Sequence, residues 1–189
     1  SGAAITIYFL ALFLFFLAYS LKKNSYNRYA MVCMGCAFTI HSSLLLIRCF
    51  ILQRPPVSDM FETVIYVPWV AVLVSFFLYY FLESLLLLVS SSITAIVLLA
   101  FLSFNNLTSG LENVQAVLDS QYWLTVHVLM VVGSYGIFIL CGILGHIYLG
   151  WYALRKKHVE EMNFISKLIL QTMYLGTALL IPGTILGGV

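Results

Sequence analysis

Charged residues are scarce in this chain. Only 8% of its 189 residues are Asp, Glu, Lys or Arg, whereas 62% are hydrophobic and 15% are aromatic. A soluble globular domain carries roughly 25% charged residues, which cover the surface that water solvates. So little charge excludes a water-soluble enzyme, a nucleic-acid-binding protein and a disordered chain. The composition therefore predicts a protein whose main partner is the lipid bilayer.

Motifs of soluble enzymes are missing as well. The sequence has no HExxH, no GxxxxGK[ST], no GxSxG and no GxGxxG following a strand. All four cysteines lie inside apolar stretches, so we expect no external disulfide framework. The segment Cys33-Met34-Gly35-Cys36 is a CxxC, but Ala37 follows it, so it is not the CxxCH that attaches haem covalently. We interpret its cysteines as small apolar residues of a membrane helix.

Long apolar runs are what the sequence does contain. A bilayer core of about 30 Å is crossed by roughly 20 helical residues. The runs therefore predict an all-α membrane protein, a single polytopic domain over residues 1–189 with six membrane-spanning helices. The spans are expected at about residues 3–21, 29–52, 61–82, 85–104, 122–154 and 168–189. The fifth has 33 residues, roughly 50 Å of helix, so it must tilt or project from the bilayer.

Basic residues are unequally distributed between the connections. The connections after the first and fifth runs hold seven, whereas the alternate ones hold Arg54, with Arg48 at the edge, against four acidic residues. Lys and Arg accumulate on the cytoplasmic side of membrane proteins. Both chain ends are therefore predicted on the outer side, which is periplasmic or lumenal. The seven residues are Lys22, Lys23, Arg28, Arg155, Lys156, Lys157 and Lys167.

Small residues recur at helical spacing in the fifth and sixth runs. In lipid, such residues let helix backbones approach one another closely. We therefore predict close helix packing there. The pairs are Gly133 with Gly136, Gly142 with Gly145, and Gly183 with Gly187.

Ionisable residues in or near lipid are costly and are therefore examined for function. His41 lies near the middle of the second run, and the sequence assigns it no role. Glu83 marks a tight turn between the third and fourth runs, where water can solvate it. We interpret His146 and His158 as interfacial or solvated histidines.

His127 opens the overlong fifth run, beside Tyr122 and Trp123. Aromatic residues of this kind are typical of the membrane interface. A neutral imidazole in this place can ligate a metal or a haem iron. A lone interfacial histidine is also often structural, so the residues alone leave both interpretations open.

The connection between the second and third runs has a well-defined pattern. Pro55 and Pro56 stiffen it and keep it out of helix. Ser58 or Asp59 can cap the next helix, with Glu62 available to complete a capping box. The pattern predicts a helix start just before the third run.

These stretches resemble the CcsA/ResC family, the haem-handling subunit of the system II cytochrome c synthetase. Arg54–Thr63 resembles the family's outer loop G-H-x-P-x-S-N-x-Y-E-S, with Asp59 where the family usually has Asn. Leu118–Val128 is similar to the family's L-x-S-x-W-L-x-x-H-V. Leu175–Val189 resembles the helix that leads into the family's Trp-rich WWD segment.

The resemblance implies a cytochrome c biogenesis protein that binds haem b at the outer membrane face and presents it for thioether attachment to apocytochrome c. His127 would be an axial ligand of the haem iron, with Trp123 and Tyr122 as nearby aromatic contacts. No side chain is given a catalytic role. The full-length complex would be a cytochrome c synthetase of the haem lyase type.

The resemblance also implies partners and a location. The partners are a CcsB/ResB-like subunit, separate or fused, and an apocytochrome c with CxxCH. The location is a bacterial inner membrane, with the thylakoid as the alternative. The WWD segment, the second external histidine and a later transmembrane histidine of the family are absent from this sequence. We therefore expect a piece of a longer polypeptide that is inactive alone.

Two other interpretations are open. One is a small-molecule transporter whose path is lined by His41 and by helices broken at Pro68 and Pro182, but it predicts an inverted repeat that the sequence lacks. The other is a noncatalytic scaffold subunit whose glycine faces bind partner helices.

Overall fold

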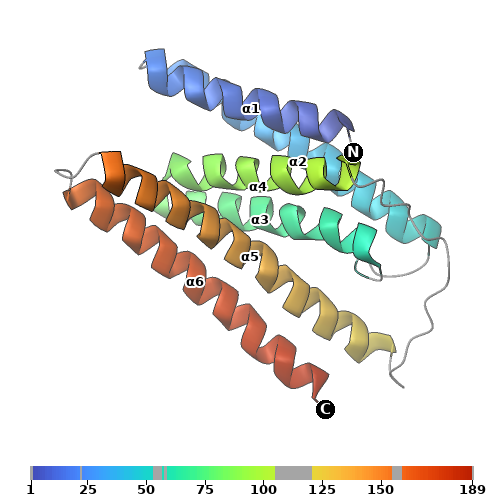
Figure 1. Ribbon diagram of the computed structural model, residues 1–189. Coiled ribbons are helices and arrows are strands. Elements are labelled where there is room, and N and C mark those ends of the chain that lie inside the picture. The colour runs from blue at the N-terminus through green and yellow to red at the C-terminus, as the bar shows by residue number, and fades with distance from the viewer. Residues whose placement is uncertain are drawn as a thin grey trace. The chain divides into compact units, whose positions relative to one another are not determined.

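The computed structural model describes residues 2–21, 23–52, 57, 59–104, 121–154 and 159–188. Over these residues the chain forms helices and no strand. All six helices are long and apolar enough to cross a bilayer, which confirms the predicted all-α membrane fold. In chain order (Figure 1) they are α1 Gly2–Leu21, α2 Asn24–Leu52, α3 Met60–Leu82, α4 Leu85–Phe104, α5 Gln121–Leu154 and α6 Val159–Gly187.

Two helices begin earlier than the apolar runs that predict them. The helix α2 starts at Asn24 rather than at Tyr29, and α6 starts at Val159 rather than at Leu168. Hydropathy marks only the part of a helix that lies in hydrocarbon, whereas the backbone hydrogen bonds continue into the polar interface. The extension of α6 is acidic in its first turn, where a helix N-terminus stabilises negative charge.

The chain divides into two compact units, residues 1–117 and 118–189, and each is described by itself. In the first unit, α1 packs against α2 and α4, and α3 packs against α4 and α2. Its apolar core includes Tyr8, Met34, Leu88 and Leu99, none of which is more than 1% exposed. Because lipid offers these side chains an equally apolar surrounding, close packing rather than escape from water holds the four helices together.

The helices α3 and α4 form a tight hairpin through Glu83 and Ser84. Glu83 has a φ of 49°, the left-handed conformation that commonly ends helices, and its N–H donates to the carbonyl oxygen of Tyr79 at 2.8 Å. This agrees with the tight turn predicted at Glu83. Further along the hairpin, the hydroxyl groups of Ser75 and Ser91 lie 2.7 Å apart and join the two helices.

His41 connects three helices of the first unit. Its side chain is fully buried, with Nε2 at 3.1 Å from the Ile65 carbonyl oxygen in α3 and Nδ1 at 3.3 Å from the Tyr8 hydroxyl in α1. Because a carbonyl only accepts, Nε2 carries the proton, and Nδ1 accepts from Tyr8. Both ring nitrogens are thus used inside the protein. His41, whose role the sequence left unassigned, is a structural residue with no nitrogen left for a metal.

The second unit is the pair of consecutive helices α5 and α6, which run beside each other (Figure 1). Glycines of α6 allow the contact. A Cβ built on Gly176 would lie 2.9 Å from the Phe138 ring, and one on Gly183 would lie 3.1 Å from Met130 and Val131. Since real Cβ atoms hardly ever come so close, the absence of side chains sets this spacing. The close packing predicted at Gly183 and Gly187 is confirmed. It is wrong for Gly142 and Gly145, since a Cβ built on either of these would meet no described atom within 4 Å.

The bonds of His41 predict a loss of stability on substitution. His41→Leu leaves the Tyr8 hydroxyl and the Ile65 carbonyl without this partner, and we expect the free energy of unfolding in detergent to fall by about 1–3 kcal/mol. Ser43→Ala is the control, since the Ser43 hydroxyl bonds to the Thr39 carbonyl within its own helix. Equal unfolding curves for the two variants would contradict a structural role for His41.

Candidate functional site

His127 lies near the start of α5 and its side chain contacts α6. Its Nδ1 is 2.6 Å from the carbonyl oxygen of Gly183, and the ring is partly buried. A carbonyl oxygen accepts and does not donate, so Nδ1 carries the proton and donates it to Gly183. In this neutral tautomer Nε2 keeps its lone pair. Within the part of the chain that the structure describes, nothing is hydrogen-bonded to Nε2.

The end of α6 is shaped to receive this ring. A Cβ built on Gly187 would overlap the His127 ring, whereas one on Gly188 would meet only backbone oxygens at ordinary distances of 3.7 and 3.9 Å. Gly183 and Gly187 are four residues apart, so they lie on one face of the helix. One glycine therefore supplies the carbonyl that accepts the bond, and the other supplies the space for the ring.

This arrangement is suited to ligate iron that is already held by a porphyrin. Histidines that bind metals commonly donate the other ring N–H to a carbonyl or carboxylate, which fixes the tautomer and the ring orientation. Among the described residues there is no group of three or more His, Cys, Asp or Glu side chains that would hold a bare metal ion. A haem needs only an axial ligand from the protein, because the porphyrin provides four nitrogens. The residues present fit that group.

The other predicted site residues are only partly described. Tyr122 and Trp123 lie in the first turn of α5, but their side chains are outside the described residues, so their predicted haem contacts stay predictions. Residues 118–120 of the same motif, and His158, are outside the described residues as well.

His146 is a second histidine of α5 with a different environment. Its side chain is exposed, and its Nδ1 lies 2.8 Å from the carbonyl oxygen of Gly142, one turn earlier in the same helix. This agrees with its interpretation as a solvated or interfacial histidine. His146 makes its bond within one helix, whereas His127 joins two.

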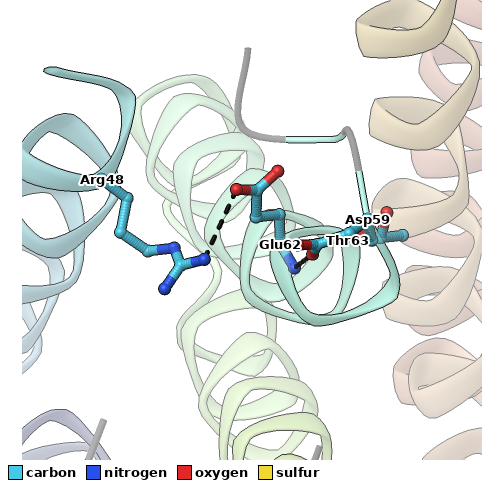
Figure 2. Close-up of polar contacts among 4 residues, drawn as sticks. All are labelled: Arg48, Asp59, Glu62 and Thr63. Carbon is cyan, nitrogen blue, oxygen red and sulfur yellow. Dashed lines mark hydrogen bonds and ion pairs between the residues drawn. The ribbon is translucent and has the colours of Figure 1, made fainter. Parts of the chain in front are cut away.

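Asp59, one of the two residues predicted to cap the third helix, is the N-cap of α3 (Figure 2). Asp59 has an extended backbone, and its Oδ1 accepts from the Glu62 backbone N–H at 2.7 Å. The Thr63 hydroxyl donates to the Asp59 carbonyl oxygen at 2.9 Å. The bond from Glu62 satisfies one of the backbone N–H groups that a helix N-terminus leaves free. The predicted roles of Arg54, Pro55, Pro56 and Ser58 fall outside the described residues.

An ion pair joins the ends of α2 and α3 beside this cap. The Arg48 Nη2 lies 3.4 Å from Glu62 Oε1, with Arg48 24% exposed and Glu62 only 2% exposed. Figure 2 shows the two side chains extending toward each other from neighbouring helices. The Arg48 guanidinium carbon also lies 4.5 Å from the centre of the Phe61 ring, a cation–π contact. This pair was not predicted, because Arg48 and Glu62 lie on different helices and only the packing of α2 against α3 brings them together.

Comparisons with known proteins point to one family. The family model described as "Cytochrome C assembly protein" matches residues 57–189, which include Asp59, Glu62, His127 and Gly183. Protein NrfI of Wolinella succinogenes is 31% identical to this chain over 157 residues, an overlap of 80% of this chain and 17% of NrfI. The chain therefore spans about a sixth of the length of this curated relative.

The ion pair predicts a coupled effect of two substitutions. Arg48→Met removes the Arg48 cation from beside the buried Glu62 carboxylate, and we expect the free energy of unfolding to fall by about 2–4 kcal/mol. Adding Glu62→Leu removes the buried charge, so the double variant is expected to regain most of the loss. The measurement is a double-mutant cycle in detergent. A double variant no more stable than Arg48→Met alone would show that the pair is not the cause.

Proposed function

The chain belongs to the cytochrome c assembly protein family, and we propose that it binds haem b at the outer membrane face and presents it for thioether attachment to apocytochrome c. A role in cytochrome c biogenesis follows from the family itself. Haem is the substrate in this proposal. The chain would act within a longer synthetase of the haem lyase type.

The observation that carries the proposal is the state of the His127 ring. Its Nδ1–H is donated to the Gly183 carbonyl oxygen at 2.6 Å, which leaves the neutral ring with a lone pair on Nε2, and no described residue is hydrogen-bonded to that atom. A histidine that only stabilised the helix pair would gain by using both nitrogens, as His41 does. The unused Nε2 supports His127 as an axial ligand of the haem iron.

The division of chemistry is simple in this proposal. Haem supplies the vinyl groups to which the CxxCH thiols of an apocytochrome add. The chain supplies one iron ligand and holds it in a fixed orientation. Trp123 and Tyr122 belong to the proposal as aromatic contacts of the porphyrin, because the family resemblance places them beside this histidine.

Partners and location form the remaining part of the proposal. They are a CcsB/ResB-like subunit and an apocytochrome c, in a bacterial inner membrane or a thylakoid membrane. Both chain ends lie on the outer side, as the distribution of Lys and Arg indicates. On this orientation the start of α5, with His127, faces the compartment in which haem is attached.

The transporter interpretation has little support. Its two features were His41 lining a path and helices broken at proline. His41 is fully buried with both nitrogens bonded, and α3 and α6 continue through Pro68 and Pro182. No observation favours a transporter over the haem-handling role.

The proposed ligand predicts the haem content of a variant. In the full-length protein purified in detergent, His127→Ala is expected to weaken or shift the Soret band, because the iron loses an axial nitrogen. Added imidazole is expected to restore the band. His146→Ala is the matched control, since His146 lies on the same helix, is exposed and bonds to its own helix. Identical spectra for the wild type and His127→Ala would remove His127 from the site.

The predicted orientation can be measured separately by cysteine labelling. With the four native cysteines replaced, Met60→Cys at the start of α3 and Glu160→Cys at the start of α6 are both exposed positions. A maleimide that cannot cross the membrane should label position 60 in intact cells, and position 160 only after permeabilisation. Labelling of position 160 in intact cells, with position 60 labelled only after permeabilisation, would show that the topology is the opposite of the predicted one.

A further inference from the structure

We infer that the end of α6 is a positioning element for the haem ligand: the Gly183 carbonyl fixes the His127 tautomer, and Gly187 gives the ring its place. This inference rests on the proposed function, because it assumes that His127 ligates iron. It goes further by assigning roles to two residues that have no side chain. Neither touches the iron in this account, and both act through His127.

The hydrogen bond between His127 and Gly183 determines which ring nitrogen carries the proton. At 2.6 Å, Nδ1 and the Gly183 oxygen are too close for two lone pairs to face each other, so the proton must lie on Nδ1. A neutral imidazole carries one N–H, which leaves Nε2 as the only nitrogen able to bind a metal. Gly183 therefore decides which ring nitrogen is presented.

Gly187 provides the space in which the His127 ring lies. A Cβ at residue 187 would overlap the His127 ring, so any other amino acid there must displace it. At residue 188 a Cβ would contact only the oxygens of Thr184 and Ile185, at 3.9 and 3.7 Å. Two adjacent glycines thus differ sharply in what they allow. Of these two, Gly187 is the one whose missing side chain makes space for the histidine.

Gly183 also allows α5 and α6 to approach each other closely next to His127. Met130 and Val131 lie three and four residues after His127, so they share its face of α5. A Cβ on Gly183 would come within 3.1 Å of both side chains. Without a side chain at 183, the α6 backbone comes close enough for its carbonyl to accept from the ring. The contact and the hydrogen bond depend on the same residue.

The consequence is a stronger and better oriented ligand. Donation of the remote N–H to a carbonyl makes the other nitrogen more basic and holds the ring in one orientation. Loss of such a partner typically costs about 10- to 100-fold in metal affinity. We expect a loss of this size in haem affinity when the ring is displaced from Gly187.

The experiment compares Gly187→Ala with Gly188→Ala in the full-length protein purified in detergent. Gly187→Ala is expected to bind haem about 10- to 100-fold more weakly, and added imidazole should restore its Soret band. Its haem reduction potential should be higher, because the ferric iron loses a basic ligand. Gly188→Ala is expected to match the wild type in all three measurements.

A second measurement needs no haem and does not depend on the glycine variants. In haem-free wild-type protein labelled with ¹⁵N-histidine, the His127 signals, assigned as those lost in His127→Ala, should show a protonated Nδ1 and an unprotonated Nε2. A proton on Nε2, or Gly187→Ala and Gly188→Ala with equal haem affinity and potential, would overturn the inference. Haem retained by His127→Ala would instead overturn the proposed function, so the two failures are distinguishable.

Discussion

A polar group inside a bilayer has no water to bind, and this constraint organises the described structure. His41 meets it by bonding to α1 and α3 through both nitrogens, and the Ser75 and Ser91 hydroxyls meet it by bonding to each other. Glu62 is nearly fully buried and pairs with Arg48. Each solution joins two or more helices. His127 departs from this pattern, because it joins α5 to α6 with one nitrogen, and no described residue is hydrogen-bonded to the other.

The six helices could be predicted from the sequence because hydropathy reports directly on length in hydrocarbon. The starts of α2 and α6 could not, since their first turns are polar and only the backbone hydrogen bonds continue there. The cap at Asp59 was predictable, because its residue types occur at fixed local spacing. Hydropathy therefore does not detect a helix start whose first turn is polar. A capping residue does indicate a helix start, because its position relative to the helix is fixed.

The candidate site was predictable only in part. The family motif identifies His127, but its partner is a backbone carbonyl 56 residues away, and a backbone atom leaves no trace in the residue types. The spacing of Gly183 and Gly187 predicted close helix packing, yet nothing in it pointed to an imidazole. The Arg48–Glu62 pair was missed for a related reason: its members lie on different helices, and only the packing of α2 against α3 brings them together.

If His127 ligates iron as proposed, its hydrogen bond to α6 makes that ligand sensitive to the register of the two helices. One residue of helix corresponds to an axial shift of about 1.5 Å. A slide of α6 along α5 by one full turn of 3.6 residues, about 5.4 Å, would take the Gly183 oxygen beyond hydrogen-bonding range of the ring and carry Gly187 away from it. The affinity of His127 for the iron would then fall, although the ligand residue is unchanged. Under the proposed function, Gly183 and Gly187 thus couple the position of α6 to the strength of the bond between His127 and the iron.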